Sequence, residues 1–110
     1  MNLEITLTEE GNQSIITLAG EIDAYTAPDL KETFGIVTKK AGQEVIVDLE
    51  HVTYMDSTGL GLFIGALKST KENDSELKLV NLQDRVYRLF QITGLDEIMD
   101  IKAAIRGGNE

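Results

Sequence analysis

The sequence VIVDLEHVTYMDSTGLGLF, residues 45–63, decides the fold. It opens with Val45-Ile46-Val47, a short apolar and β-branched run that is typical of a central strand covered on both faces. Further along, Asp56-Ser57-Thr58 places three good helix-capping residues directly before an apolar segment. We therefore predict a short central strand at residues 45–47, and a helix running from about Ser57 to Lys71 that the stretch beginning at Val52 joins to this strand.

Two further strands are expected before this segment. Leu3, Ile5 and Leu7 alternate with polar residues, which is the period of a half-buried strand. After a turn at residues 9–12, the apolar run at residues 15–19 indicates a second strand. Because the connection between the two strands is short, we expect them to pair antiparallel.

A first helix is predicted between these strands and the central one. Thr26 is expected to cap it and Asp29 to bond back to the cap, while Pro28 fits the first turn because no helical hydrogen bond is lost there. Gly42 is expected to end the helix. The apolar residues that would share its buried face are Leu30, Phe34, Val37 and Ala41.

The rest of the chain continues the alternation of strands and helices. The markers are Leu77, Leu79 and Val80 for a fourth strand, Val86, Leu89 and Phe90 for a third helix that stops at Gly94, and Ile98 and Ile101 for a last short element. The order ββαβαβα predicts an α/β fold with a mixed sheet of four to five strands, in which helices join parallel neighbours through right-handed crossovers. Residues 1–105 are expected to form this single domain, followed by a frayed tail at residues 106–110.

Composition limits the chemistry of the chain. Its 110 residues suit one domain, and the absence of cysteine excludes disulfides and thiolate sites. The single His51 cannot form a multi-histidine metal site. A formal net charge of −9 repels phosphate backbones and anionic membranes, so we expect a protein partner, no nucleic acid and no membrane.

Nothing near the start of the chain has the pattern of a targeting signal, because residues 1–10 are acidic and lack an apolar core. The longest nearly uncharged stretch, residues 59–67, is too short to cross a bilayer. The chain is therefore expected to be soluble and cytoplasmic.

The helix predicted after Asp56 combines a core stripe with an uncharged opposite face. At 100° per residue, the core stripe would consist of Leu60, Phe63, Ile64 and Leu67. The opposite face would consist of Gly61, Leu62, Gly65, Ala66 and Ser69. Each internal glycine costs a helix about 1 kcal/mol relative to alanine, and small residues allow another backbone to approach closely. We favour a docking surface for another protein on this face; the alternative is that another segment of the same chain covers it.

Ser57 lies where the free amides and partial positive charge of a helix N-terminus favour an anion. A hydroxyl there could carry a phosphate without unfolding the helix, although an Asp-Ser-Thr run taken alone is more often a simple cap. Known catalytic motifs do not fit: a P-loop needs a lysine after its glycines, and a nucleophile elbow needs glycine where Met55 stands. We therefore expect neither catalysis nor a cofactor.

Three separated motifs resemble those of one protein family. Residues 54–61, YMDSTGLG, are similar to the phosphorylation-site signature of STAS-domain anti-anti-sigma factors. Residues 20–28, GEIDAYTAP, resemble the family's loop into its first helix, and residues 88–95, RLFQITGL, contain its C-terminal motif. The likeness extends over nearly the whole chain in the right order, and the nearest type is the general-stress antagonist of Gram-positive bacteria.

The resemblance implies a phosphorylation switch. It makes Ser57 the phosphoacceptor of an anti-sigma factor that is also a serine kinase, with ATP and magnesium held on the kinase. A PP2C-type phosphatase would remove the phosphate under stress. The unphosphorylated chain would bind the kinase and release its sigma factor, so that stress genes are transcribed. Thr58 offers an adjacent second hydroxyl.

The partner-binding residues are expected in the first two motifs and along the helix that follows. Asp23 matches a family position in the loop that contacts the partner. The full set is Asp23, Tyr54, Asp56, Ser57, Thr58, Gly59, Leu60, Gly61, Leu62 and Gly65, with no metal site. The free chain is expected to be a monomer. Competing interpretations are a STAS scaffold subunit of a stress-sensing or transporter complex, a nucleotide-binding or hydrolytic enzyme, and a purely structural module.

Overall fold

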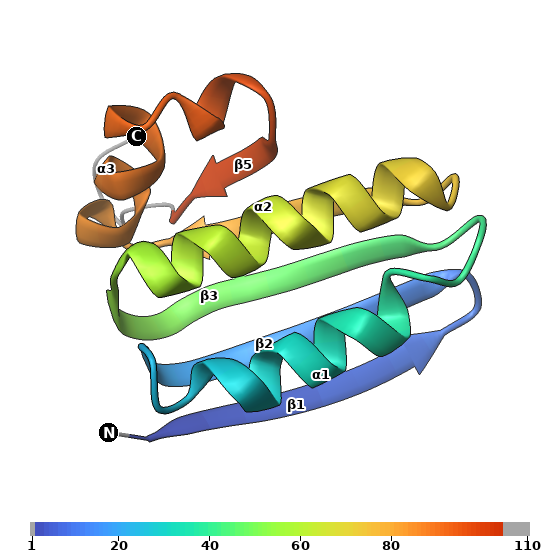
Figure 1. Ribbon diagram of the computed structural model, residues 1–110, viewed down its shortest axis with the longest axis horizontal. Coiled ribbons are helices and arrows are strands. Elements are labelled where there is room, and N and C mark those ends of the chain that lie inside the picture. Colours follow the sequence, from blue (N-terminus) through green and yellow to red (C-terminus); the bar gives the residue numbers. More distant parts are fainter. Residues whose placement is uncertain (1, 105–110) are drawn as a thin grey trace.

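The structure, a computed structural model, describes residues 2–104 and contains one five-stranded sheet with three helices (Figure 1). The elements in chain order are β1 (Leu3–Glu10), β2 (Gln13–Ile22), α1 (Ala27–Val37), β3 (Glu44–Met55), α2 (Ser57–Glu72), β4 (Glu76–Leu82), α3 (Asp84–Ile92), the 3₁₀ turn η1 (Leu95–Glu97) and β5 (Asp100–Ala103). The strands lie in the order β1-β2-β3-β4-β5. β1 pairs antiparallel with β2, and every other pair is parallel. The predicted α/β fold with a mixed sheet is confirmed. The predicted tail lies outside the described residues, and the domain boundary at residue 105 stays a prediction.

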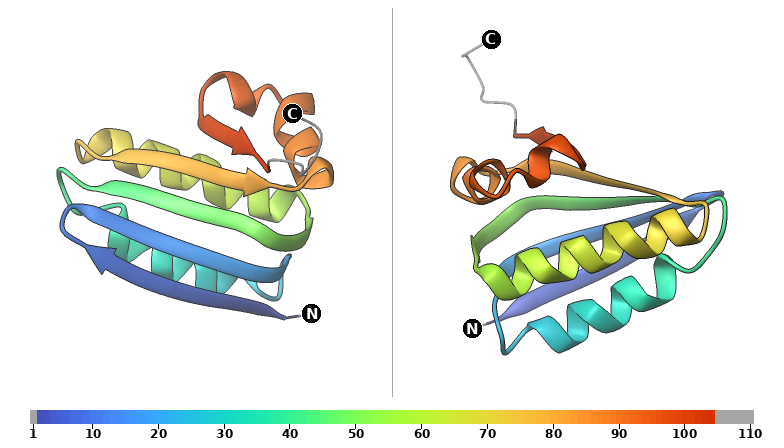
Figure 2. Two further views of the ribbon diagram at one scale, coloured as in Figure 1. Left: turned by 180° about the vertical axis from the view of Figure 1, so that it is seen from behind. Right: turned by 45° about the horizontal axis from the view of Figure 1, so that its top comes forward.

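The main core lies between the sheet and its helices. Figures 1 and 2 show α1 and α2 side by side over one face of the sheet, with α3 near the carboxyl end of β4. Three aromatic rings, one from each helix, meet in this layer. The ring centroids of Phe34 and Phe63 are 5.3 Å apart, and those of Phe63 and Phe90 are 5.8 Å apart, both in edge-on geometry. Such pairs add to the burial of apolar area, so the contacts tie all three helices to one core.

β3 is longer and less evenly covered than its sequence suggests. Val45, Val47 and Leu49 are fully buried, whereas Ile46 between them is only half-buried. The expectation that this strand is covered on both faces is therefore wrong. The left view of Figure 2 shows the strands from the side opposite to α1 and α2. Parallel pairing alone does not require two helical layers, and here α1 and α2 share one face.

The first helix differs from its prediction at both ends. It stops at Val37 instead of reaching Gly42, and Ala41 is exposed. The Thr38 hydroxyl donates to Phe34 O at 2.7 Å, so its side chain satisfies a carbonyl at the helix end. At the start, the Thr26 side chain makes no capping hydrogen bond, which contradicts the predicted pairing of Thr26 with Asp29.

The second helix begins as predicted but is rotated about its axis. Its buried residues are Gly59, Leu60, Phe63, Ala66 and Thr70. Ile64 was expected in the core and is 46% exposed, whereas Ala66 was expected on the opposite face and is 4% exposed. The prediction that Ile64 faces the core is wrong, because α2 packs against α1 as well as against the sheet. The side chain of α2 that is buried toward α1 is the small Ala66.

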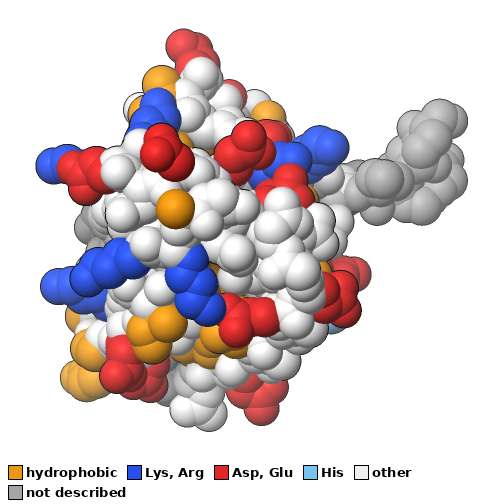
Figure 3. Space-filling view, turned by 90° about the vertical axis from the view of Figure 1, so that its right-hand side faces the viewer, with side chains coloured by type: hydrophobic (Ala, Val, Ile, Leu, Met, Phe, Trp, Pro, Cys, Tyr) orange, Lys and Arg blue, Asp and Glu red, His pale blue; other side chains and the backbone are white. Residues whose placement is uncertain are grey.

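The end of the molecule that carries the amino ends of the parallel strands has interspersed acidic and basic side chains (Figure 3). Two ion pairs at 2.5 Å, Lys40 with Glu9 and Lys78 with Glu44, lie between neighbouring elements. The hydrogen bond from each lysine lowers the pKa of its glutamate. A lowered carboxylate pKa stabilises the fold above the unfolded pKa, and this contribution is lost as pH falls through the folded pKa. All four side chains are solvent-accessible, so the effect on stability is small.

Candidate functional site

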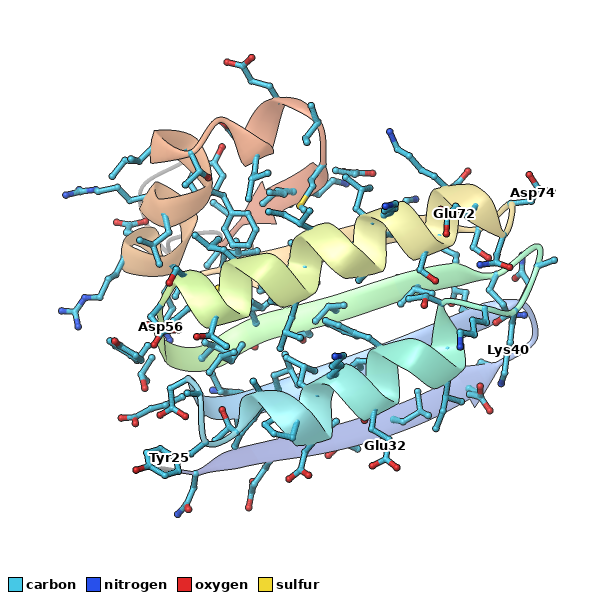
Figure 4. All side chains as sticks on the ribbon, viewed as in Figure 1. Tyr25, Glu32, Lys40, Asp56, Glu72 and Asp74 are labelled. Carbon is cyan, nitrogen blue, oxygen red and sulfur yellow. The ribbon has the colours of Figure 1, made fainter. Side chains whose placement is uncertain are left out.

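The two sequence motifs at residues 20–28 and 54–61 meet at one edge of the sheet. The register of the parallel strands β2 and β3 places Glu21 beside Tyr54 and Ile22 beside Met55. The loop into α1 and the start of α2 therefore leave the sheet side by side. Figure 4 shows Tyr25 and Asp56 at this end of the molecule. Open parallel sheets commonly place their binding sites at this carboxyl edge.

Asp23 holds the shape of the loop into α1. Its side chain is 7% exposed, and Oδ1 accepts from the backbone N–H groups of Tyr25 at 2.9 Å and Thr26 at 3.1 Å. Thr26 Oγ1 accepts from the N–H of Asp23 at 2.9 Å and donates to Glu21 O at 2.9 Å. This network fixes the loop and leaves the Tyr25 side chain 87% exposed.

We expect Asp23→Ala to lower the free energy of unfolding by about 1–2 kcal/mol, because the buried backbone N–H of Thr26 and the partly buried N–H of Tyr25 lose their acceptor. Asp23→Asn keeps an oxygen at the same position and should be destabilised by less than half as much. Urea unfolding of the three proteins measures the difference. An equal loss in both variants would show that the charge of Asp23, not its hydrogen bonds, stabilises the loop.

Asp56 caps α2. Its backbone is extended, and Oδ1 accepts from the N–H of Thr58 at 2.9 Å. The predicted cap at this junction is confirmed. Ser57, the first helical residue, is exposed, and no group within residues 2–104 forms a hydrogen bond with its hydroxyl. The free hydroxyl of Ser57 thus lies at the positive end of α2. The backbone N–H of Thr58 at the same end already donates to the Asp56 carboxylate.

A hollow of about 280 Å³ lies beside this cap. It is lined by Asp23, Ala24, Tyr25, Tyr54 and Asp56. Tyr54 is 44% exposed. Asp23 and Asp56 therefore belong to one surface, as the resemblance implied. Ala24 and Tyr25 were not singled out from the sequence as site residues, although both lie within the motif at residues 20–28.

The remaining predicted partner-binding residues divide by exposure. Thr58, Gly61 and Gly65 are exposed and Leu62 is half-buried, whereas Gly59 and Leu60 are buried. A Cβ on Gly59 would lie 2.6 Å from Met55 Cγ and 2.8 Å from Ile22 Cγ2. Gly59 and Leu60 therefore hold the start of α2 against the sheet, and the outward stripe of this helix runs through Ser57, Gly61 and Gly65 at intervals of four residues.

The uncharged face of α2 turns toward α1 without filling the space between them. A groove of about 360 Å³ separates the two helices. Its lining consists of Lys31, Phe34, Gly35, Thr38, Gly61, Leu62, Gly65, Ala66 and Ser69. At the far end, the hydroxyls of Thr38 and Ser69 share a hydrogen bond at 2.8 Å that ties the helices together. The sequence left two alternatives for this face: a docking surface for another protein, or coverage by another segment of the same chain. In the structure α1 covers part of the face, and the rest is open.

Phe34 was assigned from the sequence to the buried face of the first helix, but the other groove residues on that side, which are Lys31, Gly35 and Thr38, were not singled out. Lys31, Gly35 and Thr38 are separated by four and three residues, so they share one face of a helix. This spacing can be read from the sequence. The sequence does not show that this face of the first helix packs beside the second helix.

We expect Gly61→Ala to raise the free energy of unfolding by about 0.5–1 kcal/mol, because alanine has the higher helix propensity and its Cβ would meet nothing within 4 Å. Thermal unfolding followed by circular dichroism measures the gain. Gly59→Ala is the matched control on the same helix and should lose stability, because its Cβ would collide with Met55 and Ile22. A loss of stability in Gly61→Ala would mean that the groove is closed.

Other kinds of site find no support in the described part of the chain. No helix there is both long and apolar enough to cross a bilayer. No group of three or more histidine, cysteine or acidic side chains within residues 2–104 is placed to hold a metal ion.

The chain is similar to known proteins over nearly its whole length. The family model described as STAS domain matches residues 4–107. The anti-sigma-B factor antagonist of Listeria monocytogenes is 52% identical over 103 residues, which are 93% of this chain and 90% of the relative.

Solved structures share the fold at lower identity. An anti-sigma factor antagonist from Mycobacterium paratuberculosis superposes with a TM-score of 0.83 at 23% identity, covering 92% of this chain and 86% of that chain. The phosphorylated form of the Bacillus cell-fate determinant SpoIIAA superposes with a TM-score of 0.71 at 22% identity, covering 89% of this chain and 90% of that chain.

Proposed function

This chain belongs to the STAS domain family, and on that basis we propose that it is an anti-sigma factor antagonist controlled by phosphorylation of Ser57. The unphosphorylated chain binds an anti-sigma factor with serine-kinase activity and frees the sigma factor that the kinase holds. Phosphorylation of Ser57 ends this binding, and a PP2C-type phosphatase restores it under stress. The exchange takes place in the cytoplasm, where the sigma factor acts.

The observation that supports this proposal best is the free, exposed hydroxyl of Ser57 at the edge where both motifs meet. A kinase can reach it without unfolding α2. In the transfer, Ser57 Oγ forms a bond to the γ-phosphorus of ATP on the kinase, the bond to ADP breaks, and the hydroxyl proton passes to a base on the kinase or to water. Thr58 is exposed as well, but its backbone N–H already bonds the Asp56 cap, so a bulky group there would crowd that contact.

A phosphate on Ser57 would change the charge of the docking surface more than its shape. It adds a charge of about −1.5 to −2 directly beside Asp56 and on the same surface as Asp23. The helix N-terminus compensates little, because Asp56 already accepts from the Thr58 amide. Burying this negative charge against the partner would cost desolvation free energy and so weaken binding. This effect requires no movement of α2. We therefore propose that the phosphate blocks docking directly.

The function can be tested by measuring the intact mass of the chain from unstressed and stressed cells and mapping the modified residue. The proposal predicts a phosphate on Ser57 in unstressed cells that disappears under stress. In parallel, purified kinase and ATP should add one phosphate to the parent chain and none to Ser57→Ala. A chain that carries no phosphate in either condition, or that carries it on Thr58 in both, contradicts the proposed switch.

A further inference from the structure

The groove between α1 and α2 continues the surface that starts at Ser57. Ser57, Gly61 and Gly65 form one exposed stripe along α2, and the last two line the groove. From Gly61 to Ser69 the groove extends for about 12 Å, which is the rise of eight helical residues. A protein that docks at Ser57 would therefore lie over the open end of this groove.

The fold itself gains no packing from the three glycines in the groove. A Cβ on Gly35, Gly61 or Gly65 would meet no atom within 4 Å. Each glycine nevertheless costs its helix about 1 kcal/mol relative to alanine. The empty space above them admits the close approach of another backbone, and Phe34, Leu62 and Ala66 supply an apolar floor.

The helical layer differs in charge from the rest of the chain. α1 and α2 together carry three lysines and three acidic residues and are therefore formally neutral, in a chain with a formal net charge of −9. The three helical lysines, at positions 31, 68 and 71, form no ion pair within residues 2–104. Lys31 lines the groove, and Lys68 follows Gly65 by one helical turn. Figure 4 shows Glu32 on the side of α1 that faces away from α2.

From this combination we propose that the groove seats an amphipathic helix of the anti-sigma factor, with apolar side chains pointing into the groove and acidic side chains beside Lys31 and Lys68. The inference rests on the proposed function. It names the segment of the anti-sigma factor that binds in the groove, next to the surface around Ser57. A helix of about two turns matches the length of the groove, and side chains three and four residues apart would enter it from one face.

The chain has no cysteine, so Gly65→Cys introduces a single thiol in the groove. We expect the anti-sigma factor of the same organism, added in excess, to slow alkylation of this thiol by iodoacetamide at least tenfold. Lys102→Cys, an exposed position on β5, is the control and should react at the same rate with and without the partner. Protection of Gly65→Cys that grows with the concentration of the chain alone would assign the groove to a second copy and overturn the proposal.

Charge reversal tests the chemistry of the occupant. Lys31→Glu and Lys68→Glu should each weaken binding of the anti-sigma factor about tenfold at low salt, with a smaller effect at high salt. Lys102→Glu makes the same change in net charge on β5 and should leave the affinity within twofold of the parent. Tighter binding by the two helix variants, or an equal effect in all three, contradicts an acidic partner helix.

The two proposals fail in different ways. If the parent chain does not bind the anti-sigma factor, the proposed function is wrong. If the parent binds and Ser57→Asp does not, but Gly65→Cys stays fully reactive in the complex, the function stands and the groove inference alone is wrong.

Discussion

Phosphorylation of Ser57 is expected to weaken binding of the anti-sigma factor about a thousandfold, and Ser57→Asp about a hundredfold. At ~6 Å and an effective dielectric constant of ~20, two unit charges of the same sign repel by about 3 kcal/mol. Attraction between the phosphate and the helix N-terminus offsets at most about 1–2 kcal/mol of this repulsion. The offset is smaller here, because the Thr58 amide already donates to Asp56. A net penalty of about 4 kcal/mol for the phosphate corresponds to a thousandfold. Isothermal titration with purified anti-sigma factor measures both affinities.

Two controls separate this electrostatic effect from others. Ser57→Ala removes the hydroxyl without adding charge and should bind as tightly as the unphosphorylated parent, with or without ATP. Thr8→Asp adds the same charge on an exposed position of β1, away from the site, and should leave the affinity unchanged. Full-strength binding by Ser57→Asp would refute the electrostatic mechanism. A large shift of α2 between the free and phosphorylated structures would replace it with a conformational one.

Phe63→Ala is expected to lower the free energy of unfolding by about 3–5 kcal/mol. The side chain is fully buried, and its ring contacts Phe34 of α1 and Phe90 of α3 at centroid distances of 5.3 and 5.8 Å. Truncation would leave a cavity where three helices meet the sheet and would remove both aromatic contacts. Urea unfolding at constant pH measures the loss, and an unchanged m-value would show that the same surface is exposed on unfolding.

Ile64→Ala is the matched control for this variant. Ile64 is the next residue in the same helix and was assigned to the same core stripe from the sequence. Because its side chain is 46% exposed, its truncation should cost about 1 kcal/mol or less. Similar losses in both variants would mean that α2 sits in the rotation that the sequence pattern predicted, with Ile64 against the core.

Much of the candidate site was predictable because it depends on neighbours in the chain. The Asp56 cap, the start of α2 at Ser57 and the strand before them follow from local preferences, and the structure has all three. The sequence predicted a loop after a second strand at residues 15–19, and the structure extends that strand to Ile22, so that the loop begins at residue 23. Parallel order then brings that loop beside Ser57.

Other features depended on contacts that the sequence pattern does not encode. Asp23 was assigned a role toward a partner, but its carboxylate also accepts two backbone hydrogen bonds inside its own loop. The end of α1 was predicted from Gly42, whereas Thr38 ends it through hydrogen bonds to Phe34 O and to Ser69 on α2. The second of these bonds joins residues 31 positions apart, which no local preference predicts.

The sequence by itself determined the order of strands and helices, the capped start of α2 and the family, because these depend on residue type and on spacing over a few positions. The tertiary structure decided how α2 is rotated, and with it which side chains of the helix are buried. An apolar stripe of four positions fits a sheet in more than one rotation, and contact with the neighbouring helix selects one of them. With α1 in place, Ala66 lies inside, Ile64 lies outside, and the open groove runs on from Ser57.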